Sequence, residues 1–207
     1  MTLAQLSDAV ALKLGYNTQD RKTHIGLVSF LADKVRGAAI PAYVQQYGKT
    51  SLNLFCKPII LDVKKDKQRD RKYVELNFSV LGLSNNMGIV QVSLTQEDEG
   101  SFVGINPGML STYSILEAGG GAGRTMYWVE GKRIYFKNIK PYATEVLVKC
   151  IPSIFNNLDE DEEIPQPYEF DSLLVDGTAQ ALQEQKFTPE DKANDIISNP
   201  INAGGGK

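Results

Sequence analysis

The chain has 207 residues, of which 42% are hydrophobic and 23% are charged, and its formal net charge at pH 7 is −3. This composition is typical of a globular protein of one or two domains with a sizeable core. The slightly acidic balance excludes an overall basic surface for nucleic acid. The sequence also predicts neither a signal peptide nor a membrane span, since its first residues and its apolar runs lack the required patterns.

Histidine and cysteine usage limits the kinds of active site that the chain can build. His24 is the only histidine, which excludes a histidine-rich metal site, and we interpret it as structural or exposed. Cys56 and Cys150 lie in strand-like runs. We interpret them as buried free thiols, with a disulfide or a reactive pair as the alternative. These residues predict no enzymatic activity and no cofactor or metal site.

The first fifty residues show helical spacing of their apolar side chains. This spacing predicts a helix over residues 3–15 that Gly15 ends. A second helix should begin after a cap at Asn17 or Thr18, and Pro41 should kink or end it.

After residue 51 the period of the apolar residues changes from about 3.6 to two, which predicts strands with one apolar face. Glu130-Gly131-Lys132 is a short hairpin loop between two of them. About six antiparallel strands of this kind are typical of a small sandwich or open barrel. The predicted strands are residues 52–63, 73–81, 89–95, 126–129, 133–137 and 144–151.

A helical period returns near the C-terminal end. Apolar residues from Phe170 to Leu182 recur at helical spacing, with Gly177 in the middle of the predicted helix. Glycine there costs about 1 kcal/mol relative to alanine, so a close helix–helix contact is expected at this position. Thr188-Pro189-Glu190 is typical of the start of a short last helix.

The order of elements predicts an α+β fold, in which a helical bundle formed by N- and C-terminal helices carries an inserted antiparallel β-sandwich or open barrel. The predicted parts are N-terminal helices over residues 1–50, an antiparallel β-domain over 51–155, an acidic, proline-containing strap over 156–167, C-terminal helices over 168–198 that pack on the N-terminal ones, and a flexible tail over 199–207.

The most basic stretch is KKDKQRDRK, residues 64–72. We interpret it as a hairpin tip in solvent, with contact to an acidic partner surface or to a DNA backbone as alternatives. The absence of interleaved aromatic residues argues against a platform for single-stranded nucleic acid. The candidate partner-binding residues are Lys64, Lys65, Lys67, Arg69, Arg71 and Lys72.

Five consecutive acids precede the segment Ile164-Pro165-Gln166-Pro167. Such a run repels itself and stays extended, so we interpret it as a linker, with electrostatic docking as the alternative. Its charge is opposite to that of the basic stretch, which suggests the hypothesis that the two pair between adjacent subunits. The acids are Asp159, Glu160, Asp161, Glu162 and Glu163.

Two further motifs invite chemical interpretations. The glycine-rich run from Gly119 to Gly123 is followed by Arg124 and by a strand, whereas a phosphate-binding loop requires a helix and a lysine at that place. We therefore predict a flexible loop that becomes ordered against a neighbour, with Arg124 as a candidate contact. Glu97-Asp98-Glu99-Gly100 is predicted to be a solvated turn, with acid–base chemistry or cation binding as the alternatives.

The segments from Trp128 to Phe136 and from Glu163 to Asp171, together with the amphipathic N-terminal helices, resemble the head–tail connector proteins of short-tailed phages. These proteins are also called tail adaptors, tail tubular protein A or ring proteins, and the ring proteins of crAss-like phages are the most similar. The resemblance implies a non-enzymatic structural protein of the virion, made in the host cytoplasm. It implies a dodecameric ring that binds the portal protein and other tail or ring proteins, takes part in tail assembly and DNA ejection, and extends a channel through which genomic DNA passes without specific binding.

A second hypothesis is an adhesion or carbohydrate-binding β-module. Its contacts would be the aromatic side chains of Tyr113, Tyr127, Trp128 and Tyr135. A hydrolase that uses Glu97 or Asp98 is a third and weaker hypothesis.

Overall fold

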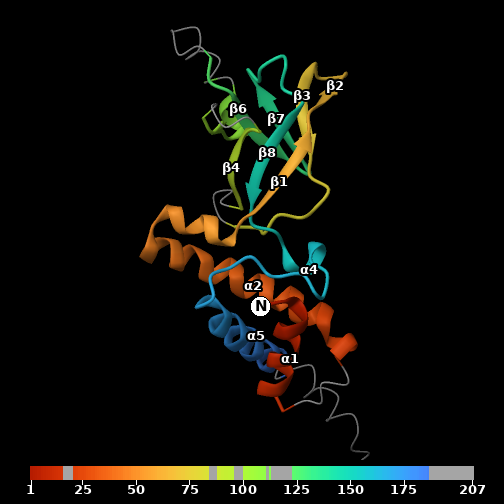
Figure 1. Ribbon diagram of the computed structural model, residues 1–207, viewed down its shortest axis with the longest axis vertical. Helices are drawn as coiled ribbons and strands as arrows, with labels where there is room; N and C mark the ends of the chain where they lie inside the picture. The colour runs from red at the N-terminus through yellow and green to blue at the C-terminus, as the bar shows by residue number, and fades with distance from the viewer. Residues whose placement is uncertain (16–20, 84–87, 96–99, 111, 113–122, 187–207) are drawn as a thin grey trace, which may run out of the picture.

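The chain forms a mixed α+β structure (Figure 1). Its described part contains four α-helices and two β-sheets of three and five strands, and these strands do not close into a barrel. The predicted α+β class is therefore confirmed. The computed structural model describes residues 1–15, 21–83, 88–95, 100–110, 112 and 123–186.

The first helix, α1 (Leu3–Lys13), begins at a capping box. The hydroxyl of Thr2 accepts a hydrogen bond from the backbone amide of Gln5, and the side chain of Gln5 accepts one from the amide of Thr2. These two bonds satisfy amide groups that have no partner inside the helix. The helix predicted over residues 3–15 is confirmed, although it ends two residues earlier.

The second helix, α2 (Arg21–Tyr47), continues through Pro41, so the alternative that Pro41 ends the helix is wrong. Pro41 has no backbone N–H to donate, yet the helix continues past it, and the neighbouring Ile40 is fully buried in the core. Gly48 ends the helix with a φ of 87°, a conformation that favours glycine.

A 3-10 helix, η2 (Lys49–Phe55), occupies the start of the strand predicted over residues 52–63, so this part of the prediction is wrong. The spacing of three between Leu52 and Phe55 suits 3-10 geometry and buries both side chains in the core that the helices share. The strand begins only at Lys57.

The strands form two sheets. In the described part of the chain, neighbouring strands pair antiparallel except the last two of the larger sheet, whose parallel pairing differs from the prediction. The smaller sheet has the order β1 (Lys57–Asp62), β8 (Glu145–Cys150), β4 (Ile89–Leu94). The larger has the order β2 (Lys64–Asp66), β3 (Arg71–Glu75), β7 (Arg133–Lys137), β6 (Met126–Glu130), β5 (Val103–Gly104).

The strand predicted over residues 73–81 stops at Glu75. In the following segment Val80 makes only an isolated bridge, to Pro152. This segment passes between the two cores, because Leu76 is buried with the strands whereas Leu81 is buried with the helices. The hairpin from β6 to β7 lies where it was predicted, and Gly131 in its turn adopts a φ of 60°.

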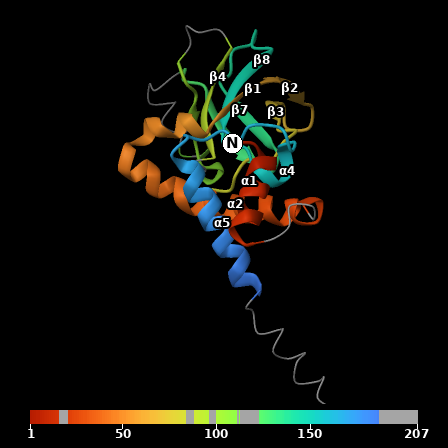
Figure 2. The ribbon, with the colours of Figure 1, turned by 60° about the horizontal axis from the view of Figure 1, so that its bottom comes forward.

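Two hydrophobic clusters account for most of the buried side chains. One joins α1, α2, η2 and α5 (Phe170–Lys186), and its members include Leu6, Leu31, Phe55 and Leu174. Figure 2 shows α5 beside α1 and α2. The other lies between the two sheets, with Val92, Val146 and Val148 from the smaller and Val74, Ile134 and Phe136 from the larger.

The predicted close approach of a second helix at Gly177 is confirmed. A Cβ atom added to Gly177 would lie 2.8 Å from Cγ1 of Val35 on α2, which is closer than carbon atoms pack. The glycine therefore allows α5 to lie directly against α2. The predicted caps Asn17 and Thr18 and the short helix predicted to start at Thr188 lie outside the described residues.

Candidate assembly surface

The basic stretch forms the hairpin of β2 and β3, at the end of the β-region remote from the helices (Figure 1). The carboxylate of Asp66 accepts hydrogen bonds from the amides of Gln68 and Arg69, at 3.0 and 3.3 Å. These bonds close the turn, as aspartate commonly does. The predicted hairpin tip is confirmed, and we call residues 64–72 the basic hairpin.

Most of the candidate cations of the basic hairpin already have partners within the chain. Three exposed ion pairs are formed, between Lys64 and Glu75 (3.1 Å), Lys65 and Asp70 (2.7 Å), and Arg69 and Glu130 (2.5 Å). The ammonium of Lys72 instead donates to the carbonyls of Lys140 and Pro141. Exposed pairs of this kind contribute about 0–1 kcal/mol each.

A layer of arginines covers aromatic rings on the outer face of the larger sheet. Tyr135 is the central ring, and the rings of Trp128 and Tyr73 each lie 5.7 Å from it, centroid to centroid. The guanidinium carbons lie 4.7 Å (Arg133 over Tyr73), 5.2 Å (Arg71 over Trp128) and 5.4 Å (Arg69 over Tyr135) from ring centroids. Cation–π attraction of this kind fixes flexible side chains.

The sequence contained a signal for this layer that the strand predictions did not use. Arg71 and Tyr73 lie two residues apart on β3, and Arg133 and Tyr135 lie two residues apart on β7. In each strand the arginine and the tyrosine therefore point to the same face. The register then places Tyr73 directly opposite Tyr135.

The acidic strap is attached to the start of α1. The amide of Ala4 donates to the carbonyl of Glu160 at 2.9 Å, and the amide of Ile164 donates to the carbonyl of Met1 at 3.0 Å. Thr2 and Glu163 form an isolated antiparallel bridge. Backbone hydrogen bonds therefore hold the strap beside α1. Repulsion between its charges, from which an extended linker was predicted, does not account for this attachment.

The side chains of the strap remain largely in solvent. Glu162 is half-buried and pairs with Lys57 on β1. The other four acids, Asp159, Glu160, Asp161 and Glu163, are exposed. The strap thus presents a fixed row of carboxylates on the side of the molecule that holds the helices.

A carboxylate on α2 holds the end of the β-region. Asp33 accepts hydrogen bonds from the hydroxyl of Ser153 (2.6 Å) and from the backbone amides of Ile154 (2.9 Å) and Phe155 (3.2 Å). The amide bonds cap α4 (Ile154–Asn157), so that a distant side chain performs the usual role of the N-cap residue.

One turn further along α2, the guanidinium of Arg36 is fully buried. It donates to the carbonyl of Pro152 at 2.9 Å and to that of Pro165 at 3.2 Å. Burial lowers its pKa to about 10, against the opposing effect of the Asp33 carboxylate 3.7 Å away. Arg36 therefore ties the end of the β-region and the strap to the same helix. The sequence predictions missed both residues.

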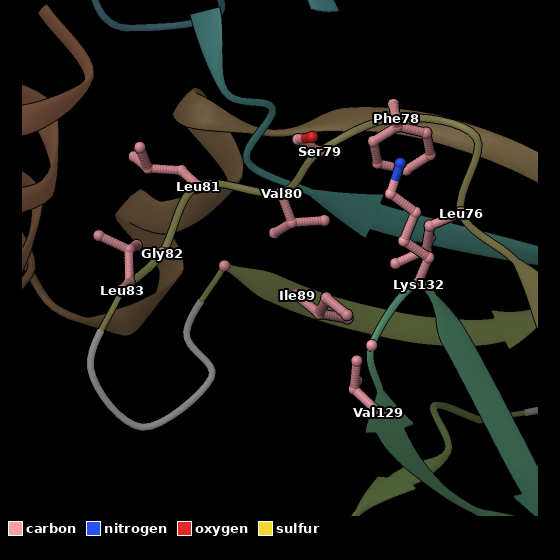
Figure 3. A pocket seen from close by; sticks show the side chains of 12 residues that line it. Leu76, Phe78, Ser79, Val80, Leu81, Gly82, Leu83, Ile89, Val129 and Lys132 are labelled. Atoms are coloured by element: carbon pink, nitrogen blue, oxygen red, sulfur yellow. The ribbon is translucent and has the colours of Figure 1, made fainter. Parts of the chain in front are cut away.

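A pocket of about 320 Å³ lies between residues 76–83, the start of β4 and the turn from β6 to β7. Figure 3 shows the apolar side chains of Leu76, Phe78 and Ile89 among its lining. Among the described residues that line it, Lys132 alone is ionisable. The pocket therefore offers apolar surface rather than groups for acid–base chemistry.

Both cysteines are free thiols, so the predicted alternative of a disulfide is wrong. Burial raises the pKa of Cys56 to about 11 and that of Cys150 to about 12. Cys150 is buried and Cys56 is half-buried. Because the thiolate is the reactive form, these raised pKa values keep both thiols largely protonated at neutral pH.

The described aromatic residues that were predicted to contact a glycan are buried or half-buried. Trp128 and Tyr135 are only 2% and 3% exposed, so neither ring has the open face that a glycan would need; Tyr127 is half-buried. Arg124 is exposed. Tyr113, the acids from Glu97 to Glu99, and the loop from Gly119 to Ala122 lie outside the described residues.

In the part of the chain that the structure describes, no three His, Cys, Asp or Glu side chains are grouped so as to hold a metal ion. None of the helices described there combines the length and the apolar character that crossing a bilayer requires. Comparison with known proteins found no family model that matches the chain and no curated protein that matches it.

Proposed function

We propose that this chain is a structural subunit of a virion ring, a head–tail connector or tail adaptor that joins the portal to the tail. One observation carries the proposal. The strap, which carries the exposed acids, is bonded to the start of α1, whereas the basic hairpin projects from the far end of the β-region (Figure 1). Two complementary surfaces at different places on one subunit favour a head-to-tail contact, which generates a ring when the rotation closes.

In this proposal the helices form a bundle around the channel, and the inserted β-sandwich contacts neighbouring subunits. The shared core of α1, α2 and α5, which come from the two ends of the described chain, supports a single helical body. The net charge of −3 supports passage of DNA without binding, because phosphate binding requires clustered lysine and arginine. The dodecameric copy number and the portal and tail partners are what the resemblance implies.

The test is the mass of the protein alone and after mixing with the portal ring of the same virus, measured by mass photometry. We expect a complex in which the chain is present in a fixed number of copies per portal. The same mixture with the portal replaced by an unrelated ring of similar size is the control. A chain that never binds a portal or another tail component would overturn the proposal.

A further inference from the structure

Arg71 is held differently from Lys64, Lys65 and Arg69. Those three cations form ion pairs, whereas Arg71, like Lys67 and Lys72, forms none with any residue that the structure describes. Its charge does act on the Glu130 carboxylate, whose pKa it helps to lower. Its guanidinium carbon lies 5.2 Å from the ring centroid of Trp128. A guanidinium stacked in this way keeps its N–H groups free at the edge, where they suit the two oxygens of a carboxylate.

Arg71 lines a hollow of about 550 Å³. Two further basic residues, Lys72 and Lys137, also line it, and the ammonium of Lys72 is fixed there by two backbone carbonyls. Asp70 is the one acid among its described lining residues, and that carboxylate already pairs with Lys65 at 2.7 Å. The apolar part of the lining consists of Leu110, Trp128, Phe136 and Ile139. The hollow is therefore lined by three basic residues and one carboxylate that is already paired, a charge balance that suits an acidic peptide segment.

The chain's own strap does not reach this hollow. Hydrogen bonds from Ala4 to Glu160 and from Ile164 to Met1 hold the strap beside α1. The basic hairpin lies at the other end of the molecule (Figure 1). Any acidic strap that enters the hollow must therefore come from another copy of the chain.

We propose that the hollow beside Arg71 receives the acidic strap of a second copy, with Asp159 and Asp161 facing the guanidinium. Both aspartates are exposed on a backbone that is already held, so little conformational entropy is lost when they dock. This inference rests on the proposed ring. It places the contact at Arg71 instead of at Lys64 and Lys65, the lysines that the charge pattern of the sequence suggested. Those two lysines are already paired with carboxylates of the same chain.

The hollow has a built-in reporter, because Trp128 is the only tryptophan of the chain, lines the hollow and lies under the guanidinium of Arg71. The experiment titrates the full-length protein with a synthetic peptide of residues 156–167 and follows tryptophan fluorescence. We expect a saturable change that disappears at high salt. The control peptide has its five acids replaced by the corresponding amides, and it should cause no change.

Variants then locate the contact by sedimentation velocity of the full-length chain. Arg71→Glu should raise the Kd for self-association about tenfold or more, because attraction to the strap becomes repulsion. Lys49→Glu makes the same charge reversal at an exposed lysine of η2, outside both the basic hairpin and the hollow, and should alter the Kd less than about twofold. Asp161→Arg should weaken association, and combining it with Arg71→Glu in one chain should restore it.

Each result has a distinct meaning. Equal effects of Arg71→Glu and Lys49→Glu, or equal fluorescence changes with the acidic and the amide peptide, would overturn the proposed hollow. Loss of binding to a DNA oligonucleotide in Arg71→Glu, with self-association unchanged, would also overturn it and would assign the hollow to nucleic acid. Specific binding of the acidic peptide by a chain that never binds a portal would support the hollow and reject the connector function.

Discussion

Asp33 and Ser153 lie 120 residues apart in the sequence, yet the carboxylate of the first accepts a hydrogen bond of 2.6 Å from the hydroxyl of the second. The same carboxylate accepts the amides of Ile154 and Phe155. A side chain on α2 thus determines where the chain turns from β8 into α4. The connection between strands and helices depends on this long-range contact as well as on local sequence.

Replacing Asp33 with alanine should lower the free energy of unfolding by about 2–3 kcal/mol, because a helix cap is lost and the buried Arg36 loses its neighbouring carboxylate. Asp33→Asn should cost less, since its amide oxygen still accepts one hydrogen bond. Urea unfolding followed by circular dichroism measures both. Gln45→Ala, on an exposed position of α2, is the control and should be nearly neutral. Equal losses for Asp33→Ala and the control would contradict the role of the cap.

Arg36→Met keeps most of the volume of the side chain but removes its donors to the carbonyls of Pro152 and Pro165. Each buried carbonyl left without a partner costs about 1–3 kcal/mol, partly offset because the buried charge is gone. We expect the strap to open more often, which limited digestion with a glutamate-specific protease detects as faster cleavage after Glu160 or Glu162. The exposed change Lys34→Met is the control. Unaltered cleavage in Arg36→Met would show that the strap is held without the arginine.

Gly177→Ala should destabilise the chain by about 1–3 kcal/mol, because the added methyl group overlaps Val35 on α2. In a Val35→Ala background the same change should instead stabilise by up to about 1 kcal/mol, since alanine is the better helix former. A double-mutant cycle from thermal or urea unfolding measures this reversal. If Gly177→Ala had the same effect in both backgrounds, the close approach of the helices would not be its cause.

The two thiols predict a loss of stability in alkali. In the unfolded chain they ionise near 9.0, whereas burial raises the pKa of Cys56 to about 11 and that of Cys150 to about 12. Between pH 9 and 11 the folded chain thus binds more thiol protons than the unfolded chain, so the free energy of unfolding falls as pH rises. Each thiol contributes up to about 1.4 kcal/mol per pH unit. Urea unfolding between pH 8 and 10 should show a smaller slope after Cys56→Ala or Cys150→Ala, and the smallest slope in the double variant. An identical slope in all four chains would contradict the assignment.

Local patterns predicted the elements whose side chains alternate or recur without interruption. The helices over residues 3–13 and 170–186, the strand over 89–94 and the hairpin over 126–137 were all predicted near their observed positions. Each carries its own signal, because one face of the element is buried along its whole length.

The features that the sequence did not predict depend on partners far along the chain. Arg36 reaches carbonyls 116 and 129 residues away, and no spacing rule indicates such a partner. Residues 76–83 have the alternation of a strand but pass between two cores instead. The basic hairpin was predicted, but the neutralisation of Lys64 by Glu75 follows from strand register, which composition does not specify.

The packing of α5 against α1 and α2 has a consequence for biosynthesis. α1 and α2 leave the ribosome before α5, which covers their apolar faces and begins only at Phe170. The strands between them can pair with one another earlier, since domains generally fold as units during translation. Nascent chains that stop before Phe170 therefore carry an uncovered apolar helix pair beside a folded β-region. Such truncated chains are the expected targets of chaperones and proteases.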